Sequence, residues 1–112
     1  MAEIVVTGAF KINQGKEEEA LEAFTALVAP THEEKGCILY ALHQGTDDRG
    51  RLTYIERWES REDLDAHLES DHVKGLLERS DELWGENGEI TVFEAVPAGE
   101  PKKGTLRDHA GG

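Results

Sequence analysis

The sequence predicts a single α+β domain in which four antiparallel strands carry helices on one face. Four short segments alternate apolar and polar residues, as half-buried strands do, and two longer segments repeat apolar residues with helical spacing. Their order along the chain is strand, helix, strand, strand, helix, strand. A chain of 112 residues has room for one hydrophobic core, so these elements are expected to share it.

The first half of the chain is expected to form a strand, a helix and a second strand. Residues 4–11 alternate as a strand, and residues 16–29 have helical period with three glutamates in the first turn, where the helix dipole favours negative charge. Pro30 is expected to kink or end this helix. Thr31 and Glu34 have the spacing of a capping box for one further turn, and Gly36 is expected to stop it before a strand at 37–44.

The second half is expected to begin with a hairpin and to end in a tail. A polar loop bounded by glycines, 45–50, leads to a strand at 51–58. Ser60 is expected to cap a helix that runs to about Ser70. The last elements are a helical stretch at 72–84 and a strand at 90–96, and the glycine-rich, polar segment 98–112 predicts a flexible C-terminal tail after a domain at 1–97.

This order of elements is the ferredoxin-like β-α-β-β-α-β plan, in which both helical regions lie on one face of the sheet. Alternation places Thr53, Ile55 and Arg57 on the other face, which then needs a cover. The same face of an identical chain is the simplest cover, so we expect a homodimer.

Composition excludes several classes of partner. A formal net charge of −12 disfavours binding to nucleic acid or to an anionic membrane surface, since both need clustered Lys and Arg. Cys37 is the only cysteine, so neither an internal disulfide nor a thiolate metal cluster is expected. The chain shows neither a secretory signal nor eighteen consecutive apolar residues, and a cytoplasmic protein is the expectation.

The segment from Tyr54 to Lys74 carries the candidate chemistry. Strand alternation puts Glu56 between two aromatic residues on one face, and helical spacing puts His67 on the apolar face of the next helix. If these faces meet, Glu56 and His67 share an interior. We therefore predict His67 as a proton acceptor and Glu56 as its orienting partner or as a base with a raised pKa. The alternative is a structural ion pair of Glu56 with His67 or with Arg57 of a neighbouring chain.

Other side chains are candidates for a substrate pocket. His72 lies where the second helix breaks, either at a pocket mouth or as a solvent-exposed or capping residue. His67 and His72 are five residues apart, which is not the i, i+4 spacing of a helical metal site, although the break at Ser70 could rearrange them; no metal is expected. The candidates for an apolar pocket, which are otherwise packed core residues, are Tyr40, Tyr54, Trp58, Leu76 and Trp84, with Phe10, Phe24 and Leu77 beside them.

The residues of four short motifs resemble the antibiotic biosynthesis monooxygenase (ABM) domain over roughly residues 3–96. They are Gly36-Cys37-x-x-Tyr40, Glu56-x-Trp58-x-Ser60, Leu64-x-Ala66-His67-Leu68 and His72-x-Lys74. The small bacterial quinol monooxygenases are the most similar group. The resemblance implies a dimeric α+β barrel of ferredoxin-like subunits and a cofactor-independent monooxygenase that oxidises a small hydroquinone or phenol with molecular oxygen.

Two alternatives remain open at this stage. The same fold hosts non-oxygenase dimers that bind or isomerise a small metabolite. Haem-degrading relatives are a third possibility, but the positions that match their asparagine, tryptophan and histidine ligand are Thr7, His67 and Leu77, and leucine cannot bind iron. The chain carries no phosphate-binding glycine loop and no dinucleotide fingerprint, so no flavin or nicotinamide is expected.

Overall fold

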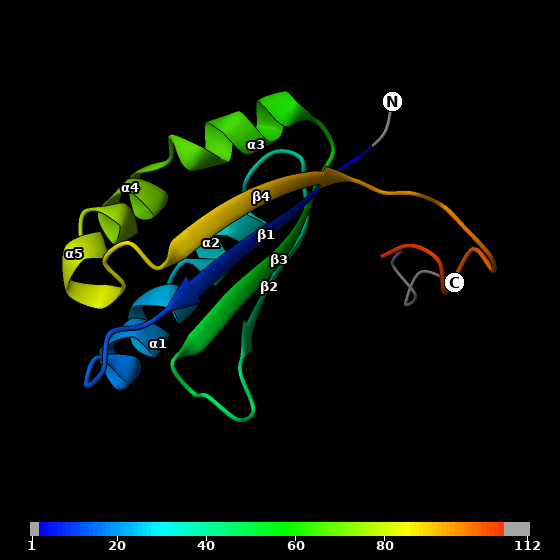
Figure 1. Cartoon of the computed structure of the whole chain (residues 1–112). Helices are drawn as coiled ribbons and strands as arrows, with labels where there is room; N and C mark the ends of the chain where they lie inside the picture. Colours follow the sequence, from blue (N-terminus) through cyan, green and yellow to red (C-terminus); the bar gives the residue numbers. More distant parts are fainter. Residues whose placement is uncertain (1–2, 107–112) are drawn as a thin grey trace.

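A four-stranded antiparallel sheet carries the helices on one face in the computed structural model, which describes residues 3–106 (Figure 1). The strands are β1 (Ile4–Lys11), β2 (Cys37–Gln44), β3 (Arg51–Trp58) and β4 (Gly88–Glu94), in the order β2-β3-β1-β4. The two central strands, β1 and β3, are the first and third along the chain. This arrangement confirms the predicted α+β, ferredoxin-like fold.

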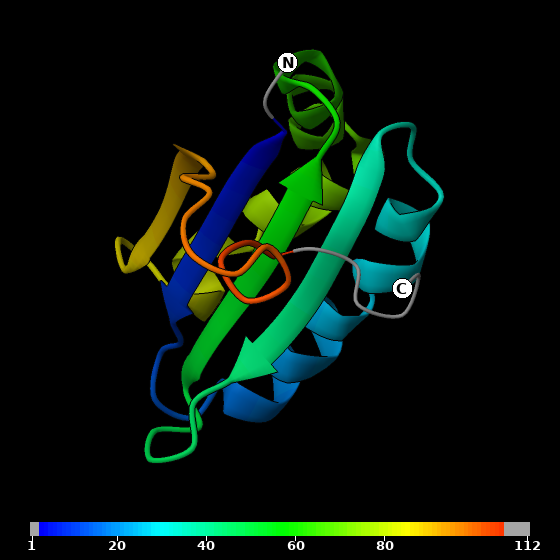
Figure 2. The ribbon, with the colours of Figure 1, turned by 90° about the vertical axis from the view of Figure 1, so that its right-hand side faces the viewer.

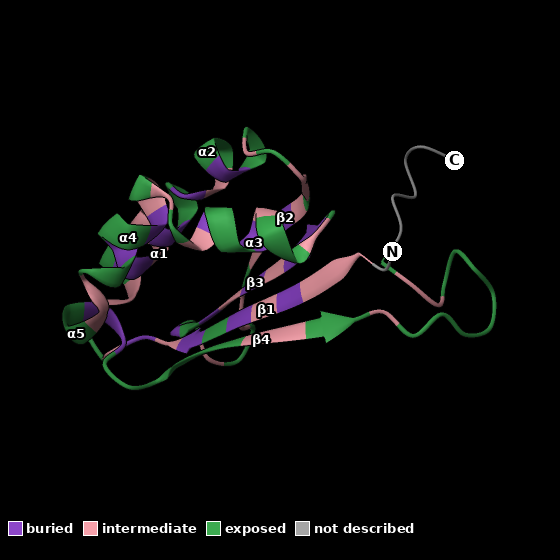
Figure 3. Ribbon diagram, turned by 90° about the horizontal axis from the view of Figure 1, so that it is seen from above, coloured by how far each residue is buried: buried purple, intermediate pink, exposed green. Residues whose placement is uncertain are grey.

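Within residues 3–106, five helices cover that face of the sheet. They are α1 (Glu17–Thr25), α2 (Val28–His32), α3 (Arg61–Leu68), α4 (Asp71–Leu77) and α5 (Ser80–Leu83). Figure 3 shows buried stretches both in the helices and along β1 and β3. The core therefore lies between the helices and the central strands.

The first predicted helix, 16–29, is two helices in the structure, and Pro30 does not separate them. The helix is interrupted at Ala26 and Leu27, and Pro30 lies inside α2. It is the third residue of α2, where its missing N–H needs no helical partner. The predicted capping box is also wrong, because the Thr31 hydroxyl is buried without a hydrogen-bond partner among the described residues and Glu34 turns its carboxylate elsewhere.

Two other boundaries differ from prediction. The helical stretch expected at 72–84 is interrupted between α4 and α5, and the strand expected at 90–96 is β4, two residues earlier. Gly88 and Glu89 give no apolar signal, but they pair with Phe10 and Ala9 of β1. Pairing with a neighbouring strand thus defines this edge strand better than its own side chains do.

The other face of the sheet carries small and apolar side chains. Strand pairing places Thr7, Ala41 and Ile55 in one row across it, and all three are half-buried. Arg57 lies on this face in an ion pair with Glu3. The segment that follows β4 turns to the same side and crosses in front of the sheet in Figure 2.

The part of the chain that follows β4 forms turns up to Leu106 and contains no helix or strand in its described portion. The division into a domain at 1–97 and a flexible tail stays a prediction, and residues 107–112 of that tail lie outside the described residues. Within residues 3–106, no helix has the length and apolarity that a membrane crossing requires.

Candidate functional site

Two histidine side chains meet at one carboxylate oxygen of a glutamate from a distant part of the chain. Glu34 Oε2 lies 3.0 Å from His67 Nδ1 and 2.6 Å from His72 Nε2. A carboxylate oxygen accepts hydrogen bonds, so each ring donates its N–H to Glu34. His67 is 2% exposed, whereas Glu34 and His72 reach the surface with 18% and 24% of their side chains exposed. We call Glu34, His67 and His72 the carboxylate–histidine cluster.

Two serine caps place the histidines of this cluster. Ser60 accepts a hydrogen bond from the Asp63 N–H and begins α3, which turns His67 toward the sheet. Ser70 accepts from the Val73 N–H and begins α4, while its hydroxyl donates to the His67 carbonyl at 2.6 Å. The chain therefore changes direction between the histidines, and His72 folds back beside His67.

Gly36 brings the third member of the cluster into place. It has φ +80°, and a Cβ there would collide with the Asp63 carboxylate at the start of α3. Only glycine allows both the left-handed backbone and this close approach. The segment between α2 and β2 thus packs against α3, and Glu34 reaches His67.

Aromatic rings enclose His67. Its ring lies 4.7 Å from Trp58 and 5.1 Å from Tyr40, centroid to centroid. Tyr40 stacks on Tyr54 at 4.5 Å, and Tyr54 stacks on Phe24 at 5.6 Å. An unbroken row of rings therefore runs from His67 along the sheet into the core.

Glu56 lies in the same interior but does not bond to His67. Its Oε1 accepts a hydrogen bond of 2.9 Å from Trp58 Nε1, and no hydrogen bond joins it to His67 within residues 3–106. The carboxylate that hydrogen-bonds to His67 is therefore that of Glu34 and not, as predicted, that of Glu56. Burial, with the negative charge of Glu34 adding to it, raises the pKa of Glu56 to about 7, although the Trp58 hydrogen bond opposes this rise.

Burial acts on the other ionisable groups in the expected directions. It lowers the pKa of His67, although the hydrogen bond that His67 donates to Glu34 opposes the change, so the neutral ring is favoured. In the neutral ring, Nδ1 carries the proton and donates the hydrogen bond to Glu34, and Nε2 keeps a lone pair. Burial also raises the pKa of both Tyr40 and Tyr54, and that of Cys37 to about 11, so Cys37 is not an activated nucleophile.

The remaining predicted pocket residues belong to the packed core, except Leu77, which is 41% exposed. Trp84 makes edge contacts with Phe10 and Phe24 at 4.7 and 5.6 Å. Leu76 is buried, and the Tyr54 hydroxyl donates to the Phe24 carbonyl at 2.5 Å. Of the predicted substrate residues, the structure brings Tyr40, Trp58 and His72 to His67.

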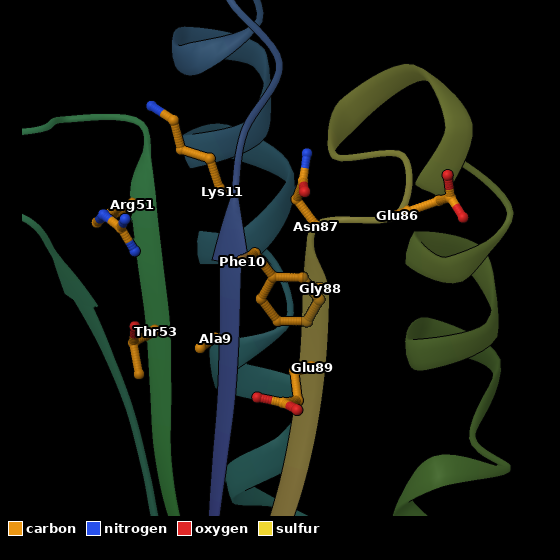
Figure 4. A pocket seen from close by; sticks show the side chains of 9 residues that line it. All are labelled: Ala9, Phe10, Lys11, Arg51, Thr53, Glu86, Asn87, Gly88 and Glu89. Carbon is orange, nitrogen blue, oxygen red and sulfur yellow. The ribbon is translucent and has the colours of Figure 1, made fainter.

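A pocket with a volume of about 400 Å³ lies elsewhere, around one end of β1, β3 and β4 (Figure 4). Thr53 and Arg51 line it from the start of β3, whereas Glu56 and Trp58 lie toward the end of that strand. Of the predicted pocket residues, Phe10 alone lines this pocket, and neither His67 nor Glu56 does. Its lining residues are Ala9, Phe10, Lys11, Arg51, Thr53, Glu86, Asn87, Gly88 and Glu89.

Sequence reasoning missed Glu34 because nothing local marks it. It lies 33 residues from His67 and 38 from His72, and its spacing to Thr31 indicated a cap instead. The three positions that match the residues of the haem-degrading relatives do not come together in the fold. Thr7 lies on the open face of the sheet, and Leu77 is 41% exposed.

Comparison with known proteins gives a consistent family. The sequence profile described as "Antibiotic biosynthesis monooxygenase" matches residues 3–79. The chain is 28% identical over 91 residues to "Uncharacterized protein sll1783" of Synechocystis, covering 81% of this chain and 62% of that protein. It is 36% identical over 68 residues to "Putative monooxygenase Rv0793" of Mycobacterium tuberculosis, covering 61% of this chain and 66% of that protein. This chain thus spans less than two thirds of either relative.

Solved structures share the fold. The crystal structure of PA3566 from Pseudomonas aeruginosa superposes with a TM-score of 0.81 at 25% identity, covering 86% of this chain and 96% of that one. The structure of Rv0793 superposes with a TM-score of 0.77 at 28% identity, covering 88% and 98%.

Proposed function

Because this chain belongs to the antibiotic biosynthesis monooxygenase family, we propose that it is a cofactor-independent monooxygenase that oxidises a small hydroquinone or phenol with molecular oxygen. The observation that carries the proposal is the buried His67 ring, held through Nδ1 by Glu34 and enclosed by Tyr40 and Trp58. This arrangement offers a lone pair on Nε2 inside an aromatic environment.

The proposed oxidation requires a base in the protein, whereas the substrate itself supplies the electrons. Removal of a phenolic proton gives an electron-rich anion that can pass an electron to oxygen. One oxygen atom then enters the product and the other leaves as water, with the substrate as the electron source. The protein has to accept the proton, hold the anion and exclude water.

His67 is the proposed proton acceptor and Glu34 its orienting partner. A carboxylate that accepts the Nδ1 proton fixes the ring and stabilises the imidazolium that forms when Nε2 takes up a proton, as in hydrolase triads. Glu56, with its pKa raised to about 7, is proposed as a second proton-exchanging group near the substrate.

The ring contacts favour a flat aromatic substrate. Tyr40 and Trp58 present ring faces and edges beside His67, and aromatic pairs gain about 0.5–1.5 kcal/mol beyond simple burial. We propose that the substrate enters where Glu34 and His72 reach the surface. Tyr54, Leu76 and Trp84 then support this binding region from the core.

We further propose that two chains associate through the open face of the sheet. Ile55 and Ala41 form a half-buried apolar surface there, which a second copy would cover. Ile55→Lys is expected to convert a dimer to a monomer in analytical ultracentrifugation, whereas Leu77→Lys on the helical side leaves the dimer intact. A monomeric unmodified protein contradicts this proposal.

Oxygen uptake by chelator-treated protein with a reduced naphthoquinol tests the activity. His67→Ala is expected to lower the enzymatic rate by about 10²–10⁴-fold, the range of general-base catalysis. Glu34→Gln removes the charge that supports the imidazolium and is expected to lower kcat more than it raises KM. His43→Ala, on the exposed part of β2, is the matched histidine control.

Three results would overturn this proposal or favour one of the alternatives. Uptake by His67→Ala equal to that of the unmodified protein removes His67 as the base. No uptake above the spontaneous rate across several quinols, together with quinol binding, favours a binding or isomerising module. A Soret shift on titration with hemin would instead support haem binding.

A further inference from the structure

We propose that the carboxylate–histidine cluster is a binding site for one borderline divalent transition-metal ion, of the class of Zn²⁺ or Co²⁺. Two imidazole nitrogens and a carboxylate oxygen are ligands that such ions take together. The three ligand atoms lie within 4.8 Å of one another. The site is formed only by folding, because its residues come from three separate segments.

The distances suit an ion of this size. In a tetrahedral site, metal–nitrogen and metal–oxygen bonds of about 2.0–2.2 Å place neighbouring ligand atoms roughly 3.4 Å apart. Glu34 Oε2 is already 3.0 Å from His67 Nδ1 and 2.6 Å from His72 Nε2. An ion has to widen both contacts by less than about 1 Å, and the part-exposed His72 ring at the start of α4 can make the larger of these two moves.

The surroundings give the site one rigid and one open side. His67 is fixed between Trp58 and Tyr40, and α4 is anchored by its Ser70 cap. Glu34 and His72 reach the surface, so an ion can enter there and complete its coordination with water. The aromatic side excludes further protein ligands, which leaves open positions as in other three-ligand sites.

Metal binding has a consequence for the proposed oxygenase. An ion bound to His67 Nδ1 takes the lone pair there, so the ring proton moves to Nε2. Nε2 then cannot accept a proton from the substrate. The metal site does not depend on the proposed function. The inhibition of oxygen uptake by the bound ion does rest on that function.

Titration of the metal-free full-length chain with Co²⁺, followed by its visible absorption and by calorimetry, tests the site. We expect one ion per chain, competition by Zn²⁺ and none by Mg²⁺, because imidazole ligands select against Mg²⁺. Glu34→Gln and His72→Ala are each expected to weaken binding by at least about 100-fold, since even outer groups around a metal contribute 10–100-fold.

The neighbouring exposed residues supply matched controls. Glu33→Gln and His43→Ala make the same chemical changes outside the cluster and are expected to bind Co²⁺ as the unmodified chain does. Circular dichroism of all four variants establishes that they are folded. Absence of stoichiometric binding overturns the proposal, as does equal binding by both cluster variants and their controls.

Oxygen uptake separates the metal site from the proposed activity. We expect saturating Zn²⁺ to suppress uptake by the unmodified chain by more than about tenfold, reversibly with chelator, and His72→Ala to lose this sensitivity. Stoichiometric Co²⁺ binding without any quinol oxidation rejects the oxygenase alone. Oxidation without metal binding rejects the metal site alone.

Discussion

The two ends of the layer between sheet and helices differ in what their side chains do. At one end, Phe10, Phe24 and Trp84 pack edge to face, with ring centroids 4.7–5.6 Å apart. At the other end, buried Glu56 and the carboxylate–histidine cluster hold ionisable groups in the same interior. We call these the aromatic end and the ionisable end.

Tyr54 and Tyr40 join the two ends. Their rings stack on each other, Tyr54 stacks on Phe24, and Tyr40 contacts His67. The comparison predicts that the aromatic end supplies stability, whereas burying ionisable groups at the other end costs some of it. Four tests examine this division, from the largest expected effect to the smallest.

Phe24→Ala should produce the largest loss of stability. Phe24 is fully buried and contacts three other rings, so its removal leaves a cavity that costs about 3–5 kcal/mol. Urea unfolding at fixed protein concentration, followed by tryptophan fluorescence, measures it. Leu77→Ala, at a position 41% exposed, should cost less than about 1 kcal/mol. Equal losses would contradict a stabilising role specific to the aromatic end.

Glu56→Gln should show that the ionisable end loses stability as pH rises. The pKa of Glu56 is raised from its ordinary value of 4.5 to about 7. The stability from its protonated form is therefore fully present below about pH 4.5 and is lost as pH rises through about 7. Glutamine imitates the protonated form and keeps an acceptor for Trp58 Nε1.

The variant should therefore gain stability relative to the unmodified chain between pH 4.5 and pH 8, by on the order of 3 kcal/mol. Urea unfolding of both proteins at the two pH values measures the gain. A difference that stays constant between the two values would show that Glu56 is not a protonated carboxyl in the folded chain.

Tyr54→Phe tests the junction between the ends. Its hydroxyl donates to the Phe24 carbonyl, which also accepts from the Leu27 N–H, so that carbonyl keeps a partner. We expect a loss of about 1 kcal/mol, the net value of one buried hydrogen bond, while ring stacking is retained. Thermal unfolding by calorimetry detects it, and an unchanged Tm would show that stacking alone joins the ends.

Ser70→Ala and Ser60→Ala compare two helix caps of the same chemistry. Each should cost about 1 kcal/mol of stability, since each serine accepts a hydrogen bond from the third N–H of its helix. Only Ser70 also contacts the cluster, at 3.3 Å from His72 Nε2. Ser70→Ala should therefore weaken Co²⁺ binding by about tenfold as well. Equal Co²⁺ affinity in the two variants would contradict this positioning role.

Local chemistry predicted much of this molecule. The alternation of apolar and polar residues predicted the limits of β1, β2 and β3. It also predicted that Glu56 faces the helices and Ile55 the opposite side of the sheet, as the structure has them. Ser60 caps its helix as predicted. These features depend on residues a few positions apart, whose preferences act within one strand or one helical turn.

Predictions that depended on distant contacts were less accurate. The edge strand β4 takes its limits from pairing with β1, and Glu56 bonds Trp58 within its own strand instead of His67. The cavity residue Trp84 packs at the aromatic end. For Glu56 and Trp84, the sequence correctly predicted a residue of the interior but not the residue that it contacts.

Glu34 is the member of the cluster that local sequence patterns did not predict. Strand and helix periods follow from steric and hydrophobic preferences of neighbouring residues, and they are present before the chain folds. The meeting of Glu34 with His67 and His72 depends on the turn at Gly36, on the packing of that turn against Asp63, and on the change of direction at Ser70. Those contacts fix the direction in which each element leaves its turn, and only the folded chain brings together groups separated by 33 and 38 residues.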